Sequence, residues 1–422
     1  MTILHSIPWK LNKTIKQKSL KKELLIIGGG LAGFWSAISA IRQSREIKKR
    51  DMVNITLINP DNIVTIHPTL NHESLVGLSF EMDRYFVPLG VHQIFGRVLQ
   101  IFPNANQVVI DVGNNHQVVN YDYLILASGA TIKLPKIKGI HKSFKLDSFK
   151  SALKLENHLI GLARKAHKQE GDNTILVIGS EFKGLEIAVQ IQQLAHMLSI
   201  NLPNKKDLFK IILIDEENQL ASKFSKHCRV YIEEMISYQN INVRLNSSIK
   251  TIDSHGVFLS NGDHISSKTV IWTKGLMANF LTTFFEGSRD SFNRLMVNSY
   301  LKLPEYPNVI AAGNVAHLIK NSQNDLILDC QYAQFEGRWA GNNAINDLFD
   351  IPLKNYERLD HFPCVDLGAP PQISSDNFDA EVQNKIYNQF SKERYINNTT
   401  IFPWQDIEAT VSGSYPELII KN

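Results

Sequence analysis

Cysteine is scarce in this chain of 422 residues, which contains only Cys228, Cys330 and Cys364. The three lie far apart, form no CxxC pair and make no metal-like cluster with histidines. A cysteine-based metal site and thiol–disulfide exchange are therefore excluded, and no bound metal is expected. Such sparse cysteine usage is typical of a protein that works in a reducing compartment.

Long apolar runs are also missing, since no run approaches the roughly 18–20 residues that span a bilayer. The first 22 residues contain six lysines and no acidic residue. They lack a continuous apolar core, so they do not form a secretory signal. Two interpretations of this leader stay open: a solvated basic extension, or a peripheral contact with an anionic membrane surface.

A strong charge imbalance is absent as well, because the chain contains 45 Lys and Arg residues and 41 Asp and Glu residues. A net charge of +4 is too small for the electrostatic footprint of a nucleic-acid-binding protein. The hydrophobic share of 43% and the charged share of 20% are typical of a soluble globular protein. We therefore expect a cytoplasmic protein, with at most a peripheral contact at the inner face of the membrane.

Two glycine-rich turns are present, and each follows an apolar run and precedes a helical pattern. The first contains Gly28, Gly30 and Gly33 in GxGxxG spacing, and the second keeps Gly179 and Gly184 as its outer glycines. One such turn is a weak signal, because the spacing recurs by chance. Two in one chain, both in a strand–turn–helix context, predict two nucleotide sites whose ligands exchange electrons.

The spacing of the first turn meets the requirements of a dinucleotide. Its glycines allow a tight bend, a close approach of the backbone to a pyrophosphate, and close packing of the helix. The pyrophosphate then lies at the helix N-terminus, here Leu31 and Ala32. A carboxylate normally ends the second strand and accepts ribose hydroxyls, but this chain has Asn59 there. Asp61, two residues later, is either its substitute or an ordinary turn residue.

Strand and helix signals divide the chain into five parts. A basic extension (1–21) precedes a first nucleotide-binding domain (22–145), which a second one (146–274) interrupts. The first domain resumes at 275–350, and a less periodic segment (351–422) follows. The predicted fold class is α/β, with two Rossmann-like dinucleotide-binding domains of the three-layer ββα type, the second inserted in the first, and a C-terminal α+β segment.

The stretch 60–90 is rich in histidine and proline, and we expect it to be irregular. A long irregular connection in a compact domain often forms a functional surface. Its histidines, His67 and His72, are interpreted as packing or surface residues rather than ligands.

The order of these motifs resembles a known family. In sequence they read GGGLAG, YDYLILASGAT, the second glycine turn, VIWTKG, VIAAGNVA and QYAQFEGRWAGNNAI. This order is similar to that of the FAD-dependent pyridine nucleotide–disulfide oxidoreductase superfamily, and in particular to its type II NADH dehydrogenase-like branch. The resemblance covers roughly residues 22–350, and it implies FAD and NAD(H) as cofactors.

The resemblance implies that the first turn binds the ADP part of FAD. The segment around Ser128 and Gly129 would back the flavin, and Gly313–Asn314 would hold the ribityl chain and the pyrophosphate. This chain has asparagine at both positions, 59 and 314, where the family usually has an acid. An amide still hydrogen-bonds a hydroxyl, so FAD binding is expected to be weakened rather than lost.

The resemblance also implies that the second turn binds NADH. Glu186 and Asp215 stand where the family carries an acid after the turn and an acid for the NAD ribose. Glu181 replaces the middle glycine, and its carboxylate would face a pyrophosphate. Two alternatives therefore stay open: a retained NAD(H) site, in which Glu181 turns outward or pairs with Lys183, and a degenerate one.

The predicted activity is an FAD-dependent NAD(P)H oxidoreductase, with hydride passing from NADH to the flavin. Its electrons would then go to a quinone or another small acceptor. Gln331 matches the first glutamine of the family's quinone-associated helix, but Phe335 stands at the second. Sulfide oxidation by Cys330 and Cys364 is disfavoured, because a partner cysteine before the second turn is missing.

Two other hypotheses stay open. One is a divergent, non-catalytic or regulatory flavoprotein with a degenerate NAD site. The other is a reductase that delivers electrons to a small iron–sulfur or flavin protein. The expected partners are NADH and an electron acceptor but no nucleic acid, and the C-terminal segment is a candidate homodimer contact.

Overall fold

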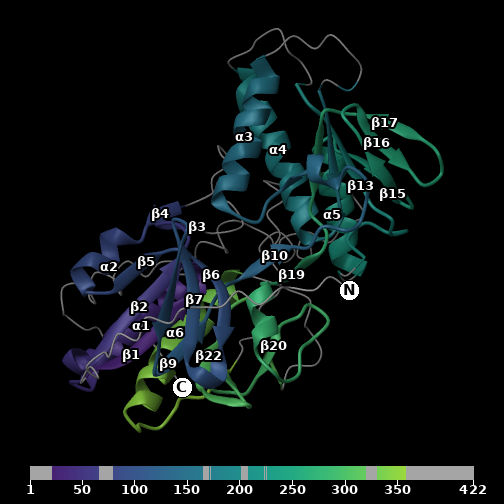
Figure 1. The fold of residues 1–422 in the computed structure, drawn as a ribbon. Coiled ribbons are helices and arrows are strands. Elements are labelled where there is room, and N and C mark those ends of the chain that lie inside the picture. Colours follow the sequence, from purple (N-terminus) through teal and green to yellow (C-terminus); the bar gives the residue numbers. More distant parts are fainter. Residues whose placement is uncertain are drawn as a thin grey trace, which may run out of the picture.

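The computed structural model describes residues 21–65, 79–164, 171, 173–200, 208–222, 224, 226–319 and 330–357. Within these residues the chain forms two lobes, one above the other in Figure 1. Several sequence predictions fall outside the described residues, namely those on 1–20, His67, His72, Cys364 and 358–422.

A six-stranded sheet forms the centre of the lower lobe, in the order β21-β22-β9-β1-β2-β5. All neighbours in it pair in parallel except β21, which pairs antiparallel with β22. Since parallel strands end at the same edge, the loops after β1, β2, β9 and β22 gather there. The bounds are β1 Lys22–Ile27, β2 Val53–Asn59, β5 His92–Phe95, β9 Tyr123–Leu126, β21 Lys302–Leu303 and β22 Tyr306–Ala311.

Two helices, α1 (Leu31–Glu46) and α6 (Cys330–Leu348), pack against one face of this sheet and against each other. Small residues make the approach close. A Cβ added to Gly337 would lie 2.3 Å from the carbonyl oxygen of Ala32, and one added to Gly341 would lie 2.1 Å from that of Ser36. These glycines therefore set the separation of the two helices.

An antiparallel meander contributes to the same core from the other face of the sheet, giving the predicted three-layer order. It consists of β6 Arg97–Phe102, β7 Gln107–Val112 and β8 Asn115–Asn120. The stretch 60–90, expected to be irregular, contains regular elements: β3 Ile63–Thr65, β4 Ser79–Glu81 and α2 Asp83–Leu89. The expectation was wrong for these elements, because Phe34 on α1 stacks on Phe86 of α2 and orders the segment.

The upper lobe contains a second sheet, which is entirely parallel and has the order β11-β18-β12-β13-β14. Three helices accompany it, and a second antiparallel meander contributes to the core on its other side. The strands are β11 Phe144–Lys145, β12 Thr174–Ile178, β13 Lys210–Ile214, β14 Asn242–Arg244 and β18 Thr269–Trp272. The helices are α3 Phe149–Arg164, α4 Phe182–Ile200 and α5 Lys226–Tyr238, and the meander is β15 Ile249–Ile252, β16 Gly256–Leu259 and β17 His264–Ser266.

A narrow antiparallel ribbon joins the two lobes. The chain leaves the lower lobe through β10 (Ala130–Ile132) and returns through β19 (Leu276–Ala278), which pairs with it. The second unit is thus inserted in the first, and the predicted α/β fold class with two Rossmann-like units is confirmed, while the domain limits and the C-terminal α+β segment stay predictions. The remaining elements are η1 Arg50–Met52, η2 Pro103–Ala105, η3 Ile140–Lys142, η4 Phe280–Phe284, β20 Leu295–Val297 and β23 Ala316–Leu318.

Candidate dinucleotide sites

The first glycine turn joins β1 to α1 at the carboxyl edge of the lower sheet. Gly28 has a φ of +106°, and a Cβ there would lie 2.3 Å from the carbonyl oxygen of Ala127. A Cβ on Gly33 would lie 1.8 Å from the carbonyl oxygen of Gly28, so only glycine closes the turn. Gly30 differs, because a Cβ there would meet nothing within 4 Å. Its open face is where the backbone can meet a phosphate.

The second turn repeats this geometry. Gly179 has a φ of +118°, and a Cβ on Gly184 would again lie 1.8 Å from the carbonyl oxygen of the first glycine. The amide of Gly179 donates to the carbonyl of Ile214 at 2.9 Å, just as that of Gly28 donates to the carbonyl of Ile58 at 2.9 Å. The two units are therefore the same structural motif.

Asn59 closes the first turn from the end of β2. Its Oδ1 accepts a hydrogen bond of 2.9 Å from the amide of Gly29, and its Nδ2 donates to the carbonyl oxygen of Asp61 at 2.9 Å. Asp61 Oδ1 also accepts from the amide of Ile63, at 3.2 Å. Asp61 thus acts as a turn residue, whereas Asn59 orders the loop that would face the nucleotide.

The loop after β9 lies against the same turn. The hydroxyl of Ser128 is buried and has no hydrogen-bond partner within the described part of the chain. Gly129 has a φ of +68° and open space beside it. An uncommitted hydroxyl and an open backbone are what a bound flavin nucleotide requires, so these residues fit FAD.

The cradle is completed by the loop after β22. A Cβ on Gly313 would lie 2.9 Å from Ala32 Cβ, so this loop packs on the first turn of α1, next to Leu31. The Gly313 amide donates to Glu336 Oε2 at 2.6 Å, and Glu336 is buried on α6. Asn314, predicted to hold the ribityl chain, follows Gly313 directly. Glu336 was not predicted, since an acid within a helical pattern gives no signal of its own.

Glu181 has a defined partner in the second turn. Its Oε1 accepts a hydrogen bond of 2.8 Å from the hydroxyl of Ser222, and its carbonyl oxygen accepts from the amide of Leu185 in the first turn of α4. Among the described contacts Glu181 thus pairs with Ser222 and not with Lys183. The bond from Ser222 gives the carboxylate a protein partner, which favours the alternative in which the site is retained.

Asp215 follows β13, where the resemblance places the NAD ribose acid. Its Oδ2 accepts from the amide of Ser180 at 2.5 Å, and its Oδ1 accepts from Lys274 Nζ at 3.0 Å and from the amide of Glu217 at 3.2 Å. Lys274 Nζ also contacts Glu216 Oε1 at 2.5 Å. Neither Ser180 nor Lys274 was predicted, although the VIWTKG motif contains Lys274.

Burial and hydrogen bonding oppose each other at this ion pair. Burial tends to raise the pKa of Asp215, but the hydrogen bonds from Lys274 and Ser180 outweigh it, so its pKa lies below the usual 3.8. Burial tends to lower the pKa of Lys274, but the bonds to Glu216 and Asp215 raise it above the usual 10.5. Both groups are therefore charged across the neutral range. Glu186, on α4, is fully buried, and its role at the NAD site stays a prediction.

Replacing Asp215 with asparagine is expected to lower the free energy of unfolding at pH 7 by about 3 kcal/mol, because Lys274 loses a buried charged partner. The contribution of a carboxyl with a lowered pKa is complete above its unfolded value near 3.8 and is lost as the pH falls through the folded value. Urea unfolding of both proteins between pH 7 and pH 3 measures this. The difference in the free energy of unfolding between the native protein and the variant should stay constant down to about pH 4 and then decrease. A difference that does not change with pH below about 4 would contradict the assignment.

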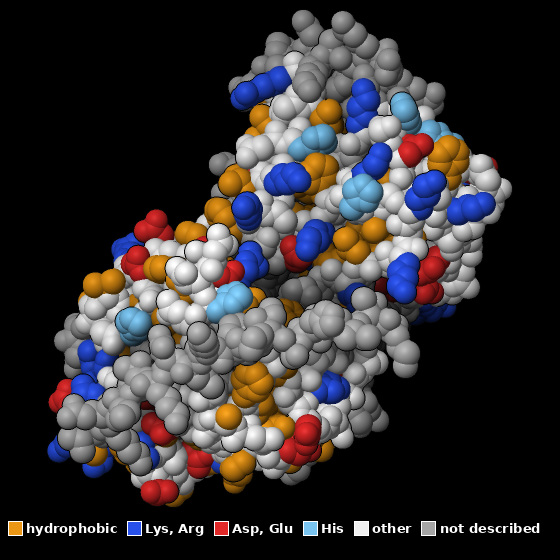
Figure 2. Space-filling view, in the orientation of Figure 1, with side chains coloured by type: hydrophobic (Ala, Val, Ile, Leu, Met, Phe, Trp, Pro, Cys, Tyr) orange, Lys and Arg blue, Asp and Glu red, His pale blue; other side chains and the backbone are white. Residues whose placement is uncertain are grey.

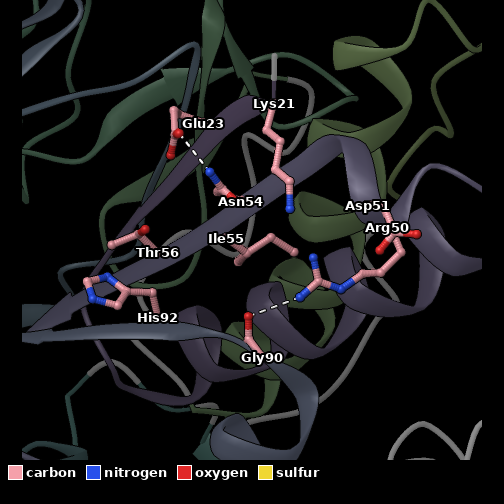
Figure 3. A pocket seen from close by; sticks show the side chains of 9 residues that line it. All are labelled: Lys21, Glu23, Arg50, Asp51, Asn54, Ile55, Thr56, Gly90 and His92. Carbon is pink, nitrogen blue, oxygen red and sulfur yellow. Dashed lines mark hydrogen bonds between the residues drawn. The ribbon is translucent and has the colours of Figure 1, made fainter. Parts of the chain in front are cut away.

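A separate surface cavity of about 570 Å³ lies near the amino ends of β1 and β2, away from the glycine turns (Figure 3). Within it Asn54 Nδ2 donates to Glu23 Oε1 at 2.8 Å, and Arg50 donates to the carbonyl of Gly90 at 3.0 Å. Its lining is polar, with acids and bases in balance: Lys21, Glu23, Arg50, Asp51, Asn54, Ile55, Thr56, Gly90 and His92. Because the cavity is at the opposite edge of the sheet, it is not part of either dinucleotide site.

One mostly parallel and one fully parallel sheet carry equivalent glycine turns and are joined by a ribbon, and together they define an oxidoreductase fold with two dinucleotide sites. The model of the pyridine nucleotide-disulphide oxidoreductase family matches residues 22–337. The chain belongs to this family. The predicted superfamily, the oxidoreductase class and the cofactors FAD and NAD(H) are thereby confirmed, whereas the individual cofactor-binding residues stay predictions.

Known proteins similar to this chain are distant in sequence but similar over most of their length. An NADH dehydrogenase-like protein of Mycobacterium tuberculosis is 27% identical over 382 residues, 90% of this chain and 94% of the relative. A type II NADH:quinone oxidoreductase of Haemophilus influenzae is 20% identical, over 82% and 85%. The solved structure of NDH2 from Plasmodium falciparum in complex with NADH has a TM-score of 0.68 at 18% identity, covering 94% of this chain and 99% of that one.

None of the helices in the described parts of the chain combines the length and apolarity that crossing a membrane requires. The backbone of Gln331 lies in the first turn of α6, whereas Phe335 packs against the core of the lower lobe. Phe335 is therefore a packing residue, and the second glutamine of the family pattern has no counterpart there.

Proposed function

We propose that the protein is an FAD-dependent NADH oxidoreductase, in which hydride passes from NADH to the flavin and the electrons then go to a quinone or another small acceptor. Similarity to NADH dehydrogenase-like proteins and to type II NADH:quinone oxidoreductases supports the donor and favours a quinone as acceptor. Glu181 turned toward Ser222 supports a working second site.

One observation carries this proposal: the sheets that contain the two glycine turns both connect to the ribbon that joins the lobes. The first sheet reaches the ribbon three residues after β9, through 127–129, and the second reaches it three residues after β18, through 273–275. Ligands on both glycine turns would therefore point to the same region. Figure 2 shows the surface hollowed between the lobes, with charged side chains of both signs at the edge of the hollow.

The residues of the chain would act by binding and alignment. Gly30, with its open face at the start of α1, would meet the FAD pyrophosphate, and Ser128 would donate its free hydroxyl to the cofactor. The turn before α4 would bind NADH in the same way. When bound, FAD supplies the hydride acceptor, so the protein needs no nucleophile of its own and contributes orientation and electrostatics.

The first test is the absorbance of the purified protein, followed by anaerobic titration with NADH. We expect a flavin spectrum that bleaches on stoichiometric NADH, because both sheets connect to one ribbon and the bound ligands would lie beside it. A colourless protein that takes up no added FAD would end the proposal. A parallel titration with NADPH tests the preference for NADH over NADPH that is expected from the acids at 215–217.

A second candidate is a non-catalytic flavoprotein whose NAD site is closed, and the acid at position 181 is the observation that favours it. Replacing Glu181 with glycine separates the two candidates. If the second candidate holds, the native flavin stays oxidised under NADH and the variant gains reduction. If the first holds, the native protein already turns over, and the rate changes by less than about tenfold, since the carboxylate is paired with Ser222.

A further inference from the structure

The two nucleotide-binding units correspond residue by residue in the loop that precedes the ribbon. After β9 the lower unit has Ala127, Ser128 and Gly129, and after β18 the upper unit has Thr273, Lys274 and Gly275. The amides of Ala127 and Thr273 donate to the last residues of β1 and β12, at 2.8 and 3.0 Å. The last glycine of each triplet has a positive φ, +68° and +82°. Lys274 therefore occupies the position of Ser128.

Because the lysine is longer than the serine, it spans the second turn. A Cβ on Gly179 would lie 2.7 Å from Lys274 Cγ, so the lysine stem passes directly over the turn. Its Nζ then bonds to Asp215 and Glu216 at the end of β13. This salt bridge joins the two strand ends between which a dinucleotide would lie, and the short Ser128 makes no such bridge in the lower unit.

The bridge covers the acid assigned to the NAD ribose. The side chain of Asp215 is 0% exposed, whereas those of Lys274 and Glu216 are 28% and 58% exposed. Asp215 already accepts hydrogen bonds on both oxygens, including the one from Lys274. A ribose hydroxyl can therefore reach Asp215 only if Lys274 moves away.

We propose that Lys274 gates the pyridine nucleotide site. The ribose hydroxyls of the adenosine half replace the ammonium group at Asp215, and Lys274 must leave before the dinucleotide occupies the turn. The ligand class is an ADP-ribose-containing dinucleotide, so the inference rests on the proposed function. Binding then breaks the Lys274–Asp215 ion pair. The apparent affinity equals the affinity of the open site multiplied by the fraction of molecules in which the site is open.

Calorimetric titration of the FAD-saturated protein with ADP-ribose tests the gate without requiring turnover. In Lys274→Met, which keeps an apolar stem but lacks the ammonium group, we expect binding about tenfold tighter than in the native protein. Lys210→Met is the matched control, since Lys210 is exposed at the other end of β13, and its affinity should equal the native value. Unchanged affinity in Lys274→Met overturns the gate. Weaker binding also overturns it, because Lys274 would then contact the bound ligand.

Glu216→Gln provides a second variant, in case loss of the lysine disturbs the fold. Glu216 is exposed and forms the second ion pair of Lys274. Loss of its charge should make it easier for Lys274 to leave Asp215 and should tighten ADP-ribose binding about threefold. Unchanged or weaker binding contradicts the gate. Anaerobic NADH titration of the native protein separates the two claims. Flavin reduction together with unchanged ADP-ribose affinity in the variants would contradict only the gate. Absence of reduction together with tighter ADP-ribose binding in the variants would contradict only the proposed function.

Discussion

Replacing Gly33 with valine is expected to release the flavin, whereas replacing Gly184 with valine should leave the flavin bound and abolish its reduction by NADH. In each case the new Cβ would lie 1.8 Å from the carbonyl oxygen of the first glycine of the turn. This oxygen belongs to the backbone, so the clash can be relieved only by moving the turn itself. Opening the turn costs about 3 kcal/mol, which corresponds to roughly 100-fold in affinity. We expect opposite effects of the two substitutions because the proposed function assigns one ligand to each turn.

Two measurements check this pattern: the ratio of flavin to protein absorbance after gel filtration, and the rate of flavin reduction by NADH in the stopped flow. Gly161→Val is a suitable control, since Gly161 lies in α3 of the upper lobe without a positive φ and with nothing within 4 Å of an added Cβ. Flavin loss in the Gly184 variant, with flavin retained in the Gly33 variant, would reverse the assignment of the two sites.

Replacing Gly341 with alanine is expected to lower the free energy of unfolding by about 2 kcal/mol, although alanine favours helices more than glycine does. Gly341 faces α1, where the new methyl group would lie 2.1 Å from the carbonyl oxygen of Ser36 and 2.9 Å from the amide nitrogen of Ala40. The two helices would have to separate. Since α1 also begins at the first glycine turn, flavin affinity should fall with stability.

The same substitution at Gly161 is the matched control. Gly161 lies in α3 with nothing within 4 Å of an added Cβ, so alanine there should raise the free energy of unfolding by about 0.5–1 kcal/mol. Urea unfolding followed by circular dichroism measures both variants. Equal effects of the same sign would show that the separation of α1 and α6 is not set by Gly341.

The fold could be predicted from the sequence because its strongest signals are local. Each glycine turn stands between an apolar strand and a helical pattern, and the apolar run before the first turn forms β1, Lys22–Ile27. The interruption of the first unit by the second could also be predicted, since the motifs of the lower unit occur on both sides of the upper one.

The contacts around the turns could not be predicted in the same way, because they join residues distant in the chain. Glu336 reaches Gly313 from a separate helix, and Lys274 reaches Asp215 across 58 intervening residues. Polar side chains buried between α1 and α6 carry no sequence signal either: Gln43 Nε2 donates to Asn346 Oδ1 at 2.7 Å. Only pairing across helices makes such polar residues suitable for an interior.

The ribbon of β10 and β19 makes the upper lobe a removable part of the chain. Ile132 pairs with Leu276, and the amide of Lys133 donates to the carbonyl of Gly275 at 2.8 Å, so the inserted stretch starts and finishes at neighbouring points. A short turn could close that gap and leave the lower sheet with all six of its strands. Insertions with adjacent ends can be exchanged between proteins, and under the proposed function the donor specificity would be exchanged with the upper lobe.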